Sequence, residues 1–200
     1  LDRTAVTMMV ALCMLWGLQQ VAIKATAPSL NPVLQVGIRS TVGAILLLIY
    51  AGMTRQAIWR RDGTFWPGVL AGAAFALEFL FMAVGLFYTT ASHMVVFLYT
   101  MPIFAALGLH WLVPGERLLP VQWLGVLTAF LGIVCAFSSS FFSAEQDFSS
   151  ILIGDMFGIG AGLLWAATTL IIRSTVLSEA APTKTLLYQL VVTAVFVTPM

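Results

Sequence analysis

Seven stretches of this chain are each close to 20 residues long and nearly free of charge, and this pattern limits the fold more than any other feature. Roughly 20 apolar residues form a helix that crosses about 30 Å of hydrocarbon, because each residue adds about 1.5 Å. Hydrophobic residues make up 60% of the 200 residues and charged residues only 8%, against about 25% charged residues in soluble domains. The pattern therefore predicts an all-α integral membrane protein.

Prolines and short polar gaps bound the expected helices. These helices cover residues 4–26, 32–53, 65–88, 93–112, 120–138, 153–176 and 182–200. Small residues recur every four positions in two of them, a spacing that lets helix backbones approach closely. The recurring residues are Gly68, Gly72 and Ala76, and Gly154, Gly158 and Gly162. Cys13 and Cys135 lie inside apolar runs and are read as small hydrophobic residues, not as a disulfide or metal framework.

The basic residues predict the orientation of the chain. Lysine and arginine are enriched in cytoplasmic loops. With a cytoplasmic N-terminus, seven basic residues fall on or near the cytoplasmic side: Arg3, Arg55, Arg60, Arg61, Arg117, Arg173 and Lys184. Lys24 alone is then left near the outer face. The net charge of +1 offers no surface that could neutralise phosphates, so nucleic acid is not an expected partner.

A repeat with a period of about 150 residues links the two ends of the chain. Trp16, Gln19, Gln20 and Lys24, shifted by 149, fall on Trp165, Thr168, Thr169 and Arg173. Pro32, Gln35 and Arg39, shifted by 150, fall on Pro182, Thr185 and Gln189. The unit holds five helices, and because five is odd, the second copy enters the membrane from the opposite side. This is an inverted repeat, as in many secondary transporters.

The repeat predicts three regions. Residues 1–140 form the first five-helix unit, 141–152 an outer connecting loop, and 153–200 the start of the second unit. Ten transmembrane helices are expected in the full protein, of which about seven are visible. We therefore expect three further helices, about one hundred residues by this repeat, after Met200.

Several short motifs resemble those of the drug/metabolite transporter superfamily, specifically its ten-helix EamA-type members. The matching residues are Leu15-Trp16-Gly17, Ala22-Ile23-Lys24, Arg39, Pro114-Gly115-Glu116-Arg117, Gln122-Trp123-Leu124-Gly125 and Gly132-Ile133. The resemblance implies that helices one to four and six to nine surround a central cavity, that no cofactor is needed, and that substrates are small organic metabolites. Within the superfamily the chain is similar to bacterial aromatic-amino-acid exporters of the inner membrane.

Two charged side chains are expected inside the membrane, where a charge is a functional candidate by default. Glu78 lies about 20 Å into its helix at ~1.5 Å per residue. It is either a protonated acid bonded to a neighbouring helix or a cavity carboxylate that meets an amine or carries a proton. Arg39 lies one or two turns into its helix. It can pair with Glu78, bind a substrate carboxylate or reach the outer interface.

The other candidates are aromatic or polar side chains on predicted inward faces. His93 is either a proton-coupling group or an interfacial hydrogen-bonding residue. Tyr99 and Tyr188 can stack on a ring or simply pack. The full set of candidate substrate-binding residues is Trp16, Gln19, Gln20, Arg39, Glu78, His93, Phe97, Tyr99, Trp165, Thr169 and Tyr188. No catalytic and no metal-binding residue is predicted.

These observations predict a multi-pass transporter of the bacterial inner membrane that exports amino acids, aromatic and other neutral ones, by alternating access. Its predicted partners are a small-molecule substrate and the lipid bilayer, and its predicted state is a monomer. Efflux of drugs or nucleobases is the alternative within the superfamily. A channel or a seven-helix receptor is the alternative of another class. An enzyme is not expected, since no serine-hydrolase, aspartate-cluster or metal-ligand motif is present.

Overall fold

The computed structural model describes residues 3–26, 31–56, 58, 62–113, 117–142 and 148–198. Within these ranges it describes all side chains except those of residues 13, 16, 17, 19–26, 32, 136, 137, 139–142 and 148. Every regular element in this part of the chain is a helix, which confirms the predicted all-α class. The elements are α1 (Arg3–Thr26), α2 (Pro32–Met53), α3 (Phe65–Gly85), α4 (Ala91–Leu98), α5 (Met101–Leu112), α6 (Pro120–Phe142), α7 (Phe148–Ser174), η1 (Val176–Glu179) and α8 (Pro182–Val197).

Four helical segments are long and apolar enough to cross a membrane. They are Val33–Met53, Phe65–Gly85, Ala91–Leu112 and Ser149–Ser174. In the described residues, Arg3–Leu12, Pro120–Cys135 and Pro182–Val197 form shorter apolar helices. All seven predicted helices are therefore present. Four of them are long and apolar enough, within the described residues, to cross a membrane.

The prediction of one continuous helix over residues 93–112 is wrong, because the helix is broken in the middle. It consists of α4 and α5, with Tyr99 and Thr100 between them. Pro102 has no N–H to donate to the carbonyl of Leu98, four residues earlier, so the helical ladder cannot continue unchanged. Instead, the Thr100 hydroxyl donates a 2.6 Å hydrogen bond to the Phe97 carbonyl.

Some predicted helix ends also need correction. The helix expected to reach residue 88 ends at Gly85, and the amides of Phe87 and Tyr88 bond to carbonyls three residues back, as in a turn. The helix expected over 120–138 continues to Phe142, and the one expected to begin at 153 begins at Phe148. Its expected end at 176 is replaced by Ser174 and the short η1 turn. These shifts leave the order of the helices unchanged.

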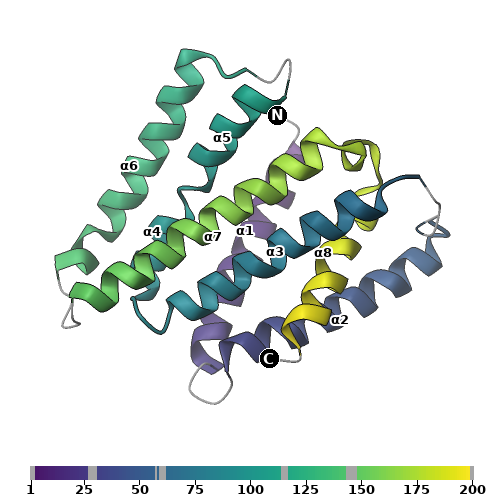
Figure 1. Ribbon diagram of the computed structural model, residues 1–200, viewed down its shortest axis with the longest axis horizontal. Helices are drawn as coiled ribbons and strands as arrows, with labels where there is room; N and C mark the ends of the chain where they lie inside the picture. Colours follow the sequence, from purple (N-terminus) through teal and green to yellow (C-terminus); the bar gives the residue numbers. More distant parts are fainter. Residues whose placement is uncertain are drawn as a thin grey trace.

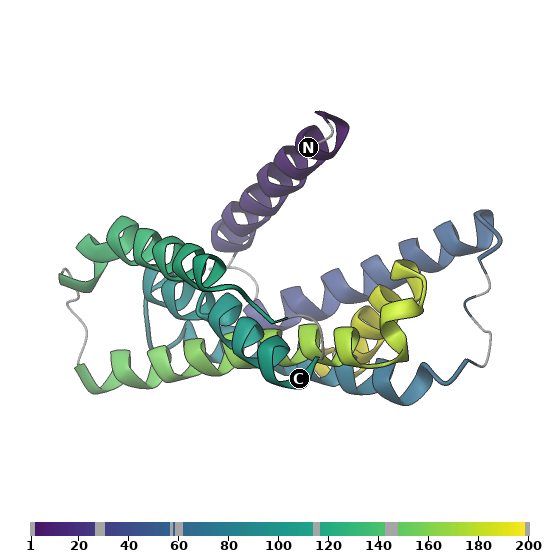
Figure 2. The same cartoon turned by 90° about the horizontal axis from the view of Figure 1, so that it is seen from above.

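The helix α3 lies at the centre of the arrangement. It packs against α7 on one side and α8 on the other, and α2 packs along α8 (Figure 1). The helices α4 and α5 pack against α7, and α6 lies outside them. Figure 2 shows α1 extending away from α3, α7 and α8. The contacts around α3 thus join helices of the first predicted unit to helices of the second.

Small residues make these close contacts possible, as their spacing predicted. A Cβ atom on Gly72 would lie 2.8 Å from the Tyr188 carbonyl oxygen and 2.8 Å from Val192 Cβ, both on α8. On α7, a Cβ atom on Gly162 would lie 3.1 Å from the carbonyl oxygens of Phe97 and Leu98. The backbone of α7 therefore lies directly against the break between α4 and α5.

Replacing Gly72 by alanine is expected to destabilise the protein. The new methyl group would clash with a backbone carbonyl, which cannot move away by changing its rotamer as a side chain could. Overpacking of this kind costs about 1–3 kcal/mol of folding free energy. For a chain of this size that corresponds to a Tm lower by roughly 2–10 °C, measured on the purified protein in detergent. Gly132→Ala in α6 is the matched control, because nothing lies within 4 Å of its added Cβ. Equal melting temperatures for the two variants would contradict the close α3–α8 contact.

Candidate functional site

Buried polar side chains are expensive in an apolar bundle, and they identify the candidate site. Glu78 on α3 is 4% exposed. Its Oε2 atom is buried and has no hydrogen-bond partner in the described part of the chain. A buried polar atom without a partner is unusual in a folded protein, which makes Glu78 a candidate functional residue. Its depth in the membrane and its contact with substrate stay predictions.

Arg39 on α2 lies beside this carboxylate. Its guanidinium carbon is 4.4 Å from the centre of the Phe79 ring, which is a cation–π contact. Arg39 and Glu78 also attract each other electrostatically. The neighbouring Ser40 is fully buried, and its hydroxyl has no partner among the described residues. The structure thus places Arg39 of α2 over the ring of Phe79, the residue next to Glu78 on α3, with the buried Ser40 beside Arg39 in the chain.

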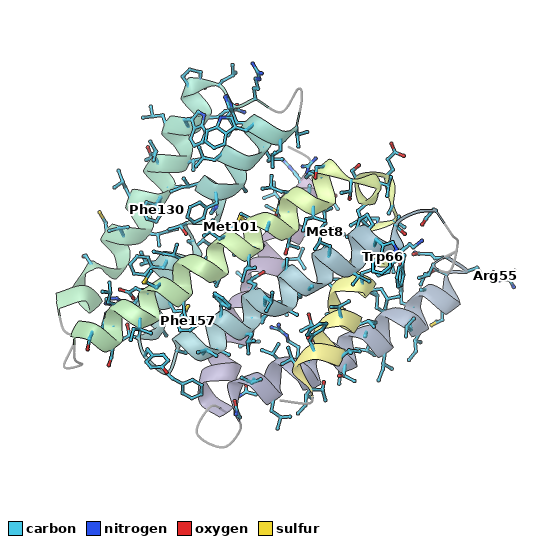
Figure 3. All side chains as sticks on the ribbon, in the orientation of Figure 1. Met8, Arg55, Trp66, Met101, Phe130 and Phe157 are labelled. Carbon is cyan, nitrogen blue, oxygen red and sulfur yellow. The ribbon has the colours of Figure 1, made fainter. Side chains whose placement is uncertain are left out.

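The break between α4 and α5 brings together two of the predicted aromatic residues. The ring centres of Tyr99 and Trp165 are 6.3 Å apart in an edge-to-face arrangement. Phe97 lies against α7, where a Cβ atom on Gly158 would be 2.8 Å from Phe97 Cβ. Thr169, one turn beyond Trp165, donates its hydroxyl to the Trp165 carbonyl at 3.2 Å. Met101 begins α5 at this break (Figure 3). Broken helices that cross a membrane commonly form substrate sites.

His93 on α4 has a partner that the sequence analysis missed. Its Nδ1 atom lies 3.1 Å and 3.2 Å from the two carboxylate oxygens of Asp155 on α7. The Thr89 hydroxyl donates a 3.1 Å hydrogen bond to the same carboxylate. His93 is 3% exposed. Close by on α7, Phe157 stacks on Tyr88 at 6.2 Å (Figure 3).

An ion pair lies at the opposite end of α3. Lys184 on α8 donates to both carboxylate oxygens of Asp62, at 2.7 Å and 2.8 Å. Asp62 also accepts a 2.6 Å hydrogen bond from the Thr64 hydroxyl. The bonds from Lys184 and then those from Thr64 hold the pKa of Asp62 well below its usual value. The carboxylate therefore stays ionised throughout the physiological range.

A pocket of about 610 Å³ opens beside this ion pair. Its polar end consists of Asp62, Thr64, Lys184 and Tyr188, and its wall is formed by apolar residues of α3 and α8. The Thr64 and Tyr188 hydroxyl oxygens are 3.3 Å apart. Since Thr64 gives its only O–H to Asp62, the Tyr188 hydroxyl donates to Thr64.

The predicted site residues do not form a single cluster. Arg39 and Glu78 lie together, Tyr99 lies by Trp165, and His93 and Phe97 share α4. Tyr188 lies at the pocket end of α3. The backbones of Trp16, Gln19 and Gln20 belong to α1, but their side chains lie outside the described residues, so their proposed contacts stay predictions.

The residues that the sequence analysis missed as site members are Asp62, Asp155 and Ser40. Asp155 lies inside an apolar run, like Glu78, so its depth was the signal that could have found it. Asp62 is the acidic residue immediately before a predicted helix. Its pairing with Lys184 spans 122 residues of sequence and has no local signal.

The His93–Asp155 pair is expected to be energetically coupled. Each of His93→Gln and Asp155→Asn weakens the hydrogen bonds between these two side chains, so each is expected to lower stability. In the double variant the loss is expected to be smaller than the sum, by about 0.5–3 kcal/mol, as is typical of contacting residues. Denaturation in detergent measures the four stabilities. Strict additivity would show that the contact contributes nothing, and Glu179→Gln on the exposed η1 turn is the acid-to-amide control.

Comparison with known proteins agrees with the apolar, membrane-spanning helices. The EamA-like transporter family matches residues 3–138. An uncharacterised transporter of Archaeoglobus fulgidus is 30% identical over 168 residues, which cover 82% of this chain and 56% of that protein. The uncharacterised transporter YvbV of Bacillus subtilis is 26% identical over 178 residues, covering 88% of this chain and 56% of the relative.

The chain thus spans about half the length of the curated relatives that it matches. No solved structure matches it significantly. The family match covers most of the chain and includes α1 to α5 and most of α6, so it contains Arg39, Glu78, His93 and Tyr99. The chain belongs to the EamA-like transporter family of the drug/metabolite transporter superfamily.

Proposed function

We propose that the protein exports small metabolites, namely aromatic and other neutral amino acids, across the bacterial inner membrane by alternating access. The observation that carries the proposal is the broken helix beside the Tyr99–Trp165 contact. A break in a membrane helix supplies backbone polar groups at depth, and aromatic rings supply a surface for an apolar side chain. Both features suit a substrate with one polar and one apolar part.

The charged pair on α2 and α3 supports the same substrate class. Glu78 offers an unfilled carboxylate oxygen that can accept a bond from a substrate ammonium. Arg39 offers a cation that can meet a substrate carboxylate. An amino acid carries both groups on one carbon atom. A nucleobase or a typical drug does not carry both groups on one carbon atom, so these substrates are the alternative to amino acids.

The packing around α3 supports alternating access as the mechanism. Helices of the first predicted unit contact those of the second through α3–α7, α3–α8 and α2–α8. In an inverted-repeat transporter the two units rock against each other around a site near the midplane. We further propose that the N-terminus is cytoplasmic, as the basic loops predict, and that the protein acts as a monomer.

Transport into liposomes tests the proposal. The protein, expressed as its whole natural chain, is reconstituted, and uptake of labelled Phe, Trp, Thr and adenine is followed. Phe and Trp are expected to be taken up, and Glu78→Gln is expected to reduce their uptake at least about tenfold, because one charge-assisted bond is lost. Glu78→Asp is expected to restore part of the activity, and Glu179→Gln is the control.

Two outcomes would contradict the proposal. Uptake of adenine without uptake of any amino acid would favour the nucleobase alternative. Single-channel currents in a planar bilayer would favour a channel, since a carrier moves too few molecules per second to produce them.

A further inference from the structure

The pocket at the loop end of α3 has a composition that the proposed midplane site does not explain. Ile58, Phe65, Val69, Leu187 and Val191 form much of an apolar wall. Among the described residues, the charged groups in its lining are Asp62 and Lys184. Its volume of about 610 Å³ lies within the range of about 300–1,000 Å³ that is usual for small-molecule sites.

The two members of the ion pair differ in their access to the pocket. The Lys184 side chain is 6% exposed and the Asp62 side chain is 37% exposed. Asp62 Oδ1 already accepts bonds from Lys184 and Thr64, whereas among the described residues Oδ2 accepts the 2.8 Å bond from Lys184 alone. A carboxylate oxygen has two lone pairs, so Oδ2 can accept one further donor from the open side.

The backbone fixes this arrangement. Gly63 has a φ of +76°, a conformation that glycine adopts without strain, and it turns the chain between Asp62 and Thr64. The turn directs the Asp62 carboxylate to the Thr64 amide, at 3.3 Å, and to its hydroxyl. Asp62 is thereby held at the start of α3, opposite the first turn of α8, where Lys184 lies.

We propose that this pocket is a loading site for amino-acid zwitterions with a large apolar side chain. The ligand ammonium binds Asp62, the ligand carboxylate binds Lys184, and the apolar side chain lies along α3 and α8. Binding thus replaces the internal Asp62–Lys184 ion pair by two ion pairs between the protein and the ligand. The direction of loading rests on the proposed export function. The distribution of basic residues predicts that this end of α3 faces the cytoplasm, so the ligand is expected to enter from there.

A structural clamp is the competing explanation, in which the pair only ties the α2–α3 loop to α8. A partly exposed ion pair contributes little stability, and a clamp needs no pocket beside it. The two explanations differ in what happens when one charge is removed. If the pair is only structural, removing either charge is expected to weaken the protein in the same way. If it binds ligand, removing the acidic charge and removing the basic charge are expected to change the ligand preference in opposite directions.

Equilibrium binding of three labelled probes to the purified whole natural chain tests the proposal. The probes are L-phenylalanine, phenethylamine, which lacks the carboxylate, and 3-phenylpropanoate, which lacks the ammonium. Phenylalanine is expected to bind at least about tenfold more tightly than either analogue, since each analogue forfeits one charge-assisted bond.

The single variants are expected to reverse this preference. Asp62→Asn removes the carboxylate that attracts both Lys184 and the ligand ammonium, so phenylalanine is expected to bind about tenfold more weakly, and phenylpropanoate more tightly, than in the natural protein. Lys184→Gln is expected to favour phenethylamine instead. Glu179→Gln is the control and is expected to leave all three affinities unchanged. Parallel weakening of all three probes in both variants, or no binding of phenylalanine to the natural protein, would overturn the proposal.

Lipid headgroups require a separate arm, because phosphatidylethanolamine also joins a primary ammonium to an anion. Binding of phenylalanine is compared in nanodiscs of phosphatidylcholine and of phosphatidylethanolamine. Equal affinities in the two lipids support an amino-acid site. Loss of binding in phosphatidylethanolamine alone would assign the pocket to the headgroup and overturn the proposal.

The transport assay separates this inference from the proposed function. If amino acids are transported with an unchanged KM in Asp62→Asn and Lys184→Gln, the loading site is wrong and the proposed function stands. If no amino acid is transported although phenylalanine binds with the expected preferences, the export function is wrong and the pocket remains a binding site.

Discussion

The close approach of helix backbones along α3 is the constraint on which the rest of the structure depends. In lipid, helices gain little from hydrophobic burial against each other, so their association relies on tight packing and on polar contacts. Gly72 brings the α8 backbone within van der Waals distance, and Gly85, at the other end, lies against α7, where its Cβ would be 3.3 Å from the Gly154 carbonyl. The register of α7 and α8 follows from these contacts.

That register in turn places the polar side chains. Asp155 directly follows Gly154, so the contact of this glycine with Thr89 brings the carboxylate to Thr89 and His93. Lys184 lies one turn before Tyr188, whose carbonyl lies against Gly72, so its ammonium reaches Asp62 at the start of α3. Both polar contacts are consequences of the backbone packing, so a small change at a glycine is expected to disturb a distant polar pair.

The helices could be predicted from the sequence because length and hydropathy are local properties. The break at Tyr99 and Thr100 was missed because the apolar run continues through it, although Pro102 gave the signal. The depth of Glu78 was predictable from the rise per residue. Its surroundings were not, because the contact of Arg39 with Phe79 depends on how α2 and α3 face each other.

The His93–Asp155 contact and the Asp62–Lys184 ion pair also constrain the proposed movement. Asp62 and His93 belong to the first predicted unit, whereas Lys184 and Asp155 belong to the second. The pairs lie at opposite ends of α3, so a rocking of one unit against the other that separates one pair need not separate the other. A zwitterion that replaces the Asp62–Lys184 contact removes the cost of separating that pair. Substrate binding and opening at that end are therefore energetically linked in the proposed cycle, since a ligand shifts an equilibrium only by its differential affinity for the two states.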